Sequence, residues 1–307
     1  MQVCKKQKLR VFTCNPFIRF FCRSKRRNLH HPMQRSALTS GYYRAIGHAA
    51  ALCRLWNGAA PARRTGPAPR PKLELFEYEA SPWCRRVRET LCVLDLEVLV
   101  RPTPRETLRV EGAYSAAAAH KPAVSAAEGR LLFPFLVDHT AGVALNQSAD
   151  VCAHLWSAYG DGVVERPTVD AWLNGGLPAP LDFVSLAGPS GLRPWPHAGL
   201  MMAPTKRAPE EPLVLHGCEP DMGCRLVREK LCMLQLPYRH VPRPIDAPLP
   251  HLEDPNTGWS SFGAAQALEY LEERYQAGEP LPWLAPVPSA NLGEARISPW
   301  VSWLYPR

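Results

Sequence analysis

The chain has 307 residues, which is enough for two domains of ordinary size, and its formal net charge is +8. Residues 1–72 hold 16 Lys and Arg residues and no Asp or Glu, which leaves 20 basic and 28 acidic residues in the remainder. A mildly acidic body gives no reason to expect a nucleic-acid partner, and the absence of an apolar run of about 18 residues argues against a membrane span.

Residues 1–72 are predicted to be a targeting leader that ends in a Pro/Arg linker. An acid-free, Arg-rich N-terminal stretch is more typical of an import peptide than of a basic arm that binds nucleic acid. We expect a disordered leader with an amphipathic helix at Tyr42–Trp56, a linker at Pro61–Pro71 and cleavage before Leu73. The expected destination is the plastid (chloroplast), with the mitochondrion as the alternative.

The stretch Leu73–Val100 predicts a strand, a turn, a helix and a second strand. Ser81 is a good helix N-cap, and Pro82 follows at the first helical position, where its missing N–H costs nothing. Apolar residues recur in the helix at spacings of four and three, which gives it one apolar face (Val87, Leu91 and Leu94). Basic residues and a glutamate occupy the other faces.

The first unit is predicted to continue to Gly162. A second helix is expected between 104 and 120, followed by a strand at Leu131–Asp138 that carries an internal Pro134. A short hairpin partner at Val143–Leu145 and a final helix that opens at Gln147 complete the unit. The resulting order is βαβ followed by αββα.

The segment Leu213–Val241 repeats the first stretch at an offset of 140 residues. This offset lays Cys224 on Cys84 and matches eight of the positions from 225 to 236, which are Arg225, Val227, Arg228, Glu229, Leu231, Cys232, Leu234 and Leu236. We therefore predict two related units in tandem.

The second unit, residues 213–278, is predicted to be a truncated copy. Pro250 takes the place of Pro134, but the spacing leaves no room for the second helix, so one sheet face needs cover from elsewhere. A strong amphipathic helix is expected at Gly263–Gln276. Residues 163–212 are predicted to be a loosely packed Pro-rich linker with one helical turn near Thr168–Leu173, and residues 279–307 form a tail.

Three motifs in the first unit indicate a known family: SPWCRRVR, FPFLVD and NQSAD. With the element order, they make this unit resemble the thioredoxin-like N-terminal domain of glutathione transferases and, more distantly, the glutaredoxins. The whole chain looks like the plant and algal plastid proteins that carry two such domains. The resemblance implies an α/β fold with two tandem thioredoxin-like domains, the second truncated, but the tail is too short for the helical domain of a transferase.

Two residues of the SPWC turn are candidate catalytic groups. The resemblance implies that the Ser81 hydroxyl binds the glutathione thiolate, while the alternative is that Ser81 is only an N-cap. Cys84 lies one turn into the helix, where the helix dipole lowers the pKa of a thiol. Without a cysteine at position 81 it cannot complete a dithiol cycle, so it is either a thiol open to glutathionylation or a partly buried structural cysteine.

The resemblance also implies where glutathione itself binds. The backbone of Phe133, turned by a cis Pro134, would pair with the cysteinyl part of the ligand. Gln147 and Ser148 would hold its γ-glutamyl group at a helix N-terminus. The alternatives are an edge-strand proline and a simple helix cap.

The second unit keeps few of these features. Asp221 stands in place of Ser81, and a carboxylate there would repel a thiolate. Gly263 and Ala264 replace the Gln-Ser pair, so this unit is expected to be a structural partner that packs on the first. Cys218 and Cys224 lie around a turn and could form a disulfide or bind a metal, but zinc-type CxxC pairs are absent and we predict no metal site.

These features predict a glutathione-binding, transferase-like protein with at most weak thiol-transfer activity, for which glutathione is a ligand or co-substrate. The alternatives are a non-catalytic thioredoxin-fold scaffold and a glutaredoxin-like oxidoreductase. The absent CxxC motif weakens the last of these.

Overall fold

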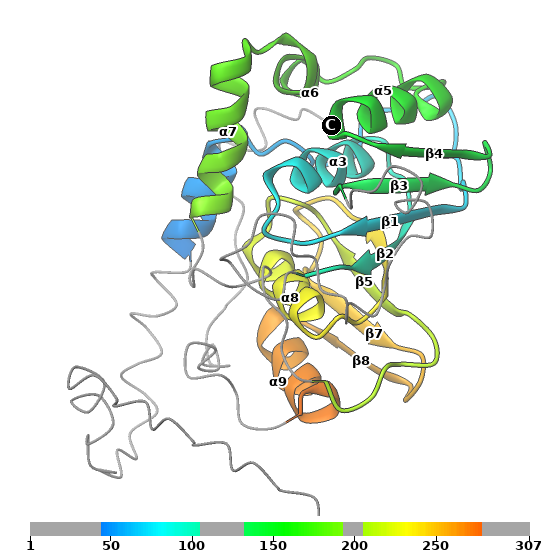
Figure 1. Ribbon diagram of the computed structural model, residues 1–307, viewed down its shortest axis with the longest axis vertical. Coiled ribbons are helices and arrows are strands. Elements are labelled where there is room, and N and C mark those ends of the chain that lie inside the picture. Colours follow the sequence, from blue (N-terminus) through cyan, green and yellow to red (C-terminus); the bar gives the residue numbers. More distant parts are fainter. Residues whose placement is uncertain (1–43, 105–131, 193–204, 278–307) are drawn as a thin grey trace, which may run out of the picture. The chain divides into compact units, whose positions relative to one another are not determined.

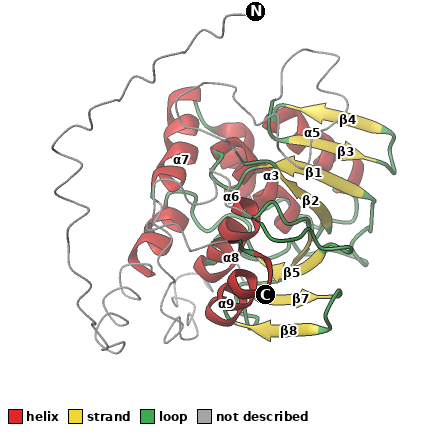
Figure 2. Ribbon diagram, turned by 60° about the horizontal axis from the view of Figure 1, so that its bottom comes forward, coloured by secondary structure: helices red, strands yellow, loops and turns green. Residues whose placement is uncertain are grey.

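The computed structural model describes residues 44–104, 132–192 and 205–277. The rest of the predicted leader, the second helix expected between 104 and 120, and the tail at 279–307 lie outside the described residues. The described strands form one eight-stranded sheet in the order β4-β3-β1-β2-β6-β5-β7-β8 (Figure 1). The helices gather on one face of this sheet (Figure 2).

The first half of the sheet belongs to residues 73–159. Its strands β1 and β2 are parallel, and β3 pairs antiparallel with both β1 and β4. Helices α3 and α5 pack against each other above these strands. The elements are β1 (Leu73–Glu77), α3 (Pro82–Val93), β2 (Val98–Pro102), β3 (Phe135–Asp138), β4 (Val143–Asn146) and α5 (Ser148–Tyr159).

The second half has the same order of described elements. Strands β5 and β6 are parallel, whereas β7 pairs antiparallel with β5 and β8. Residues 243–250, between β6 and β7, contain no helix, as the spacing predicts. The elements are β5 (Leu213–Gly217), α8 (Met222–Met233), β6 (Tyr238–Pro242), β7 (His251–Asp254), β8 (Trp259–Phe262) and α9 (Ala264–Tyr275).

The two halves join through the antiparallel pair β2 and β6 at the centre of the sheet. Leu99 lies opposite Arg239, and the neighbouring pairs are Val98 with His240 and Val100 with Tyr238. At the offset of 140, residue 99 corresponds to residue 239, so each half presents the same positions to the other. The halves are therefore related by an approximate two-fold axis between Leu99 and Arg239.

One hydrophobic core runs beneath the helices of both halves. In β1 and β5 alternate leucines face α3 and α8, because successive side chains of a strand point to opposite faces. Each of these helices presents a valine and a leucine at the same repeat positions. The buried set includes Leu73, Leu75, Val87, Leu91, Leu213, Leu215, Val227 and Leu231. Among the described residues, no helix has both the length and the apolar character to cross a membrane.

The segment 44–72, expected to be part of a removable leader, is packed into the fold. A helix spans residues 44–52, and the Arg54 and Asn57 that follow it are fully buried. Both side chains donate hydrogen bonds to the Glu89 carboxylate on α3, with the Arg54 Nη2 to Oε2 distance at 2.8 Å. The absence of acidic residues thus does not distinguish the packed part of this stretch from the part before it.

The expected loose linker also contains packed helices. The predicted helical turn is present as α6 (Thr168–Ala171), and it leads into a π-helix, η1 (Trp172–Gly176). A 13-residue helix, α7 (Ala179–Gly191), then follows despite an internal proline. Asp182 of α7 forms an ion pair with Arg86 of α3. Buried polar contacts of this kind compensate for a sequence with low helix propensity.

Candidate functional site

Three loops of the first half meet at one edge of the sheet. Phe76 at the end of β1 lies opposite Phe135 at the start of β3, and Phe135 lies opposite Asn146 at the end of β4. The turn after β1, the residues before β3 and the start of α5 are therefore neighbours. Ser81, Pro134 and Gln147 belong to these three segments.

Ser81 is the N-cap of α3. Its backbone is extended, and its Oγ accepts a hydrogen bond from the backbone N–H of Cys84 at 3.2 Å. A serine hydroxyl that accepts one bond still has its own proton to donate. The side chain is buried, however, so a ligand reaches that proton only by coming against the turn itself.

Cys84 is fully buried within the first turn of α3. Burial, together with the nearby Glu77 carboxylate, raises the pKa of the Cys84 thiol to about 12. The desolvation effect outweighs the Ser81 hydrogen bond and the helix dipole, both of which favour a thiolate. Cys84 is therefore a neutral, inaccessible thiol at neutral pH. The structure gives no support to the prediction that it is a catalytic group.

The peptide bond between Phe133 and Pro134 is cis. Phe133 is buried next to Cys84 and packs edge-on against Tyr78, with ring centroids 6.4 Å apart. The side chain of Phe133 is thus fixed inside the first half. Its backbone stands at the beginning of β3, where an added extended peptide can pair with it.

Helix α5 begins without a side-chain cap. Gln147 precedes it with a φ of 66° and makes no capping hydrogen bond, and Ser148 is the first helical residue. The first backbone N–H groups of a helix have no partner within the helix. The start of α5 therefore offers N–H donors and the positive end of a helix dipole to an anion.

The corresponding place in the second half is filled by its own side chains. Asp221 caps α8 by accepting a hydrogen bond from the Cys224 N–H at 2.6 Å. A Cβ placed on Gly223 would lie 2.7 Å from Pro250 Cδ, 3.2 Å from Asp221 Oδ1 and 3.5 Å from Ala264 Cβ. The three loops converge here too, but they leave no room for even a methyl group.

The cysteines of the second half offer neither of the chemistries considered for them. Cys218 and Cys224 are free thiols and both are fully buried. Burial, followed by the nearby Asp221 carboxylate, raises the pKa of each thiol. Since metal binding requires a thiolate, this environment disfavours a metal at the pair.

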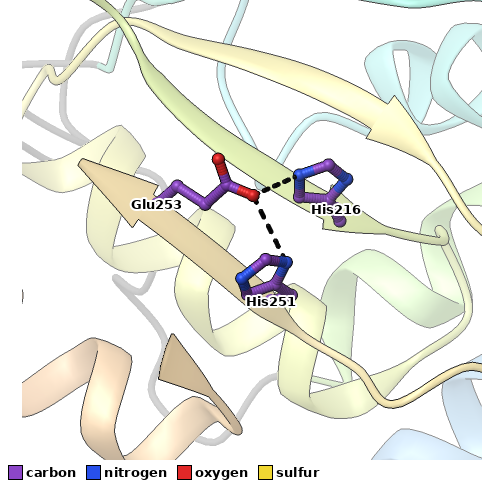
Figure 3. A group of neighbouring side chains, drawn as sticks. All are labelled: His216, His251 and Glu253. Atoms are coloured by element: carbon purple, nitrogen blue, oxygen red, sulfur yellow. Dashed lines mark hydrogen bonds and ion pairs between the residues drawn. The ribbon is translucent and has the colours of Figure 1, made fainter. Parts of the chain in front are cut away.

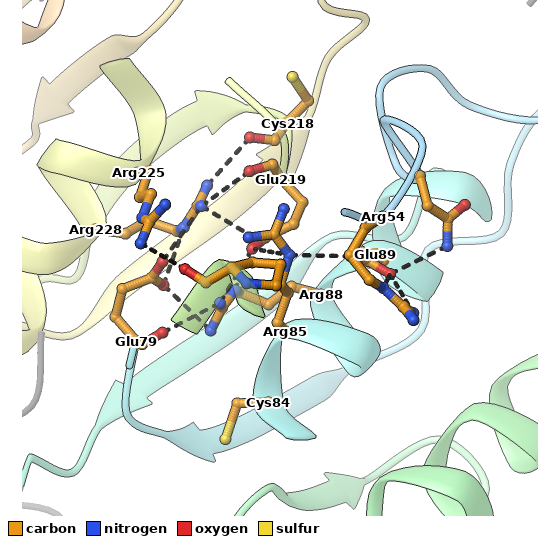
Figure 4. Close-up of polar contacts among 12 residues, drawn as sticks. Arg54, Glu79, Cys84, Arg85, Arg88, Glu89, Cys218, Glu219, Arg225 and Arg228 are labelled. Atoms are coloured by element: carbon orange, nitrogen blue, oxygen red, sulfur yellow. Dashed lines mark hydrogen bonds and ion pairs between the residues drawn. The ribbon is translucent and has the colours of Figure 1, made fainter. Parts of the chain in front are cut away.

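A buried network of charged side chains connects the two halves (Figure 4). Arg88 on α3 donates to Glu219 of the second half, with Nε 2.8 Å from Oε2. Arg228 on α8 donates to Glu79 of the first half, with Nε 3.1 Å from Oε2. These two ion pairs are exchanged by the two-fold axis, because the offset of 140 relates Arg88 to Arg228 and Glu79 to Glu219.

The network contains one carboxylate more than its symmetry requires. Glu77 binds Arg88 at 2.6 Å, but its counterpart in the second half is Gly217, which has no charge. Burial, together with the repulsion of Glu79 and Glu219, raises the pKa of Glu77 to about 7 despite the Arg88 guanidinium. The network therefore holds a proton over the acidic part of the physiological pH range.

This network is not predicted above, although the sequence contains a sign of it. The pattern places Arg88 on a polar face of its helix, and the repeat gives Arg228 the same position. They are buried, because each reaches across the two-fold axis to the glutamate in the turn before the other half's helix. An arginine and a glutamate that recur together at a fixed offset are the detectable sign of such an exchanged pair.

Comparison with known families identifies the first half. Residues 75–165 match the family model described as glutathione S-transferase, N-terminal domain. The match begins in β1 and extends past α5, so it contains every predicted site residue of the first half. Comparisons of the chain with curated proteins and with solved structures gave no significant match.

Proposed function

We propose that the glutathione S-transferase N-terminal domain at residues 75–165 binds glutathione at the edge formed by Ser81, Pro134 and Ser148. The observation that carries this proposal is the uncapped N-terminus of α5 beside the cis Phe133–Pro134 bond. A peptide with a free carboxylate can pair with the backbone before β3 and place its charge on the α5 N–H groups.

The chemistry at this site depends on the thiol of the ligand. Because Cys84 is buried with a raised pKa, it supplies no thiolate to this site, which argues against the glutaredoxin-like reaction. The proton of the Ser81 hydroxyl and the start of α3 are the groups that can stabilise a bound thiolate. We infer a binding protein with at most weak thiol transfer.

Replacing Ser148 by alanine should weaken glutathione binding by about 1 kcal/mol, or roughly fivefold, since it removes one hydrogen bond to a charged group. The measurement is calorimetry on the full chain with reduced glutathione. Ala is tolerated at the helix start of the second half, where Ala264 is the equivalent residue, so the variant should fold.

The matched control is Asp221→Ser in the second half. Serine preserves the cap of α8, as Ser81 does for α3, so this variant should bind glutathione as the wild type does. Absence of binding at millimolar glutathione in the wild type would contradict the proposal.

A non-catalytic scaffold is the second candidate. The observation that favours it is the close packing at Gly223 in the second half, where an added Cβ would lie 2.7 Å from Pro250 Cδ. On this interpretation the chain is a tandem of two thioredoxin-like domains, the second truncated, which the shared sheet and the exchanged ion pairs connect. Wild-type binding of glutathione distinguishes the two candidates.

We further propose that the N-terminal part of the chain directs it to the plastid, with the mitochondrion as the alternative. The support is the basic, acid-free composition of residues 1–72. Because residues 44–72 pack on the body, the removable part is inferred to end before Arg44. A fluorescent protein fused to residues 1–43 should enter the organelle, and a fusion that stays in the cytosol would contradict this.

A further inference from the structure

The second half carries two histidines and a glutamate on the sheet face opposite α8 and α9. His216 of β5 lies directly across from His251 of β7, and Glu253 follows two residues later on the same face. Leu215 and Leu252, which alternate with them, point into the core. Figure 3 shows the two rings and the carboxylate converging above the strands.

The donor atoms of these three side chains are close together. His216 Nε2 lies 2.9 Å from Glu253 Oε1, and His251 Nδ1 lies 3.5 Å from the same oxygen. One ligand atom from each residue falls within 4.8 Å of the others. In a tetrahedral zinc site, bonds of about 2.0–2.2 Å place ligand atoms roughly 3.3–3.6 Å apart. Small side-chain shifts would therefore bring all three donors onto one ion.

The surroundings of the rings suit ligation. His251 Nε2 lies 2.8 Å from Ser260 Oγ, and this contact orients the ring with Nδ1 toward Glu253. A hydrogen bond to the second ring nitrogen is the usual support of a histidine ligand. Phe262 stacks on His251 at 4.1 Å and covers one side.

The first half gives an internal comparison at the same three positions. Its register is identical, since Phe76 pairs with Phe135 just as His216 pairs with His251. Phe76, Phe135 and the partly buried Val137 form an apolar cluster there. A sheet face in contact with water needs only polar side chains of any kind. The second half instead carries three side chains that can all bind a metal, and their donor atoms lie close together.

We propose that His216, His251 and Glu253 bind one divalent transition-metal ion, with Zn²⁺ as the best fit. Two imidazoles and one carboxylate form a ligand set that zinc accepts in proteins, and three protein ligands leave a fourth position for water or a small ligand. Ca²⁺ and Mg²⁺ are disfavoured because they require more oxygen ligands. This site is separate from the proposed glutathione site, which lies in the first half.

The test is a calorimetric titration of the full-length protein with Zn²⁺. The triple variant H216F/H251F/E253V, which copies the first half, should bind one fewer Zn²⁺ than the wild type. The control is His139→Phe, because His139 contacts Glu74 at 3.2 Å but the described residues supply no third donor there. This control should leave both the stoichiometry and the affinity unchanged.

Two outcomes would overturn the proposal. The first is an equal number of bound ions in the wild type and a folded triple variant. The second concerns the wild type loaded with Co²⁺. A thiolate charge-transfer band that disappears in the triple variant would place the ion on cysteine. If the triple variant does not fold, Glu253→Gln decides: we expect its Zn²⁺ affinity to fall at least about tenfold, and an unchanged affinity would refute the site.

Discussion

Replacing Arg228 by alanine should lower the free energy of unfolding by about 3–5 kcal/mol, because removing one partner of a buried ion pair leaves the other charge uncompensated. Arg228 lies between the halves, where it contacts Glu79 and Glu219 and also donates to the Cys218 carbonyl oxygen at 3.1 Å. The measurement is chemical denaturation at neutral pH. Arg239→Ala, at an exposed position of β6, is the control and should change stability little.

The titration of Glu77 provides a second test of the network, through the pH dependence of the free energy of unfolding. Because the folded pKa of Glu77 is raised to about 7, its protonated form favours the folded state and this contribution is lost as pH rises from about 4.5 to above 7. Glu77→Gln should therefore be stabilising at pH 8 relative to the wild type, by on the order of 1–3 kcal/mol, and near neutral at pH 4. If Glu77→Gln destabilises as strongly as Arg228→Ala at pH 8, the account of an excess carboxylate is wrong.

Removing residues 1–72 should destabilise the body of the protein by several kcal/mol, with Arg54→Ala alone costing about 3–5 kcal/mol. Arg54 forms a buried ion pair with Glu89 and also donates to Asn174 Oδ1 and Ser185 Oγ, at 2.8 and 2.9 Å. One guanidinium thereby connects the N-terminal segment, α3 and the helices that follow α5. Its loss leaves the Glu89 charge buried with fewer donors.

The matched truncation begins at Arg44, the first described residue, and retains the helix at 44–52 together with Arg54. We expect the protein of residues 44–307 to unfold at the same denaturant concentration as the full chain. Thermal and chemical denaturation of both truncations would check this. Equal stability of the truncation at Leu73 and the full chain would mean that the packed segment contributes nothing to the fold.

Much of the fold was accessible from local patterns. The N-cap at Ser81, the apolar spacing in α3 and the internal Pro134 each depend on a few neighbouring residues, and they place the strands and helices of the first half. The repeat then predicts the second half and its missing helix between β6 and β7. These features are local because capping, periodicity and turn chemistry act over one or two turns of chain.

Local sequence patterns do not predict which charged residues are buried. An arginine on the polar face of a helix has the same local pattern whether that face meets water or another subdomain. Only the pairing of β2 with β6 brings Arg88 to Glu219 and Arg228 to Glu79, where both arginines are buried. The same holds for Cys84, whose position at a helix N-terminus suggests a low pKa until tertiary packing removes it from water.

The sequence by itself determined the motifs of the first half, which matches the glutathione S-transferase N-terminal domain at residues 75–165, and the repeated residues at an offset of 140, because both are written along the chain. Tertiary structure alone decided which residues meet: Arg54 with Glu89, and His216 with the His251-Leu252-Glu253 segment 35 residues further on. The reason is physical. Desolvation and ion pairing depend on groups that approach in space, and their sequence separation is set by the sheet rather than by the local pattern.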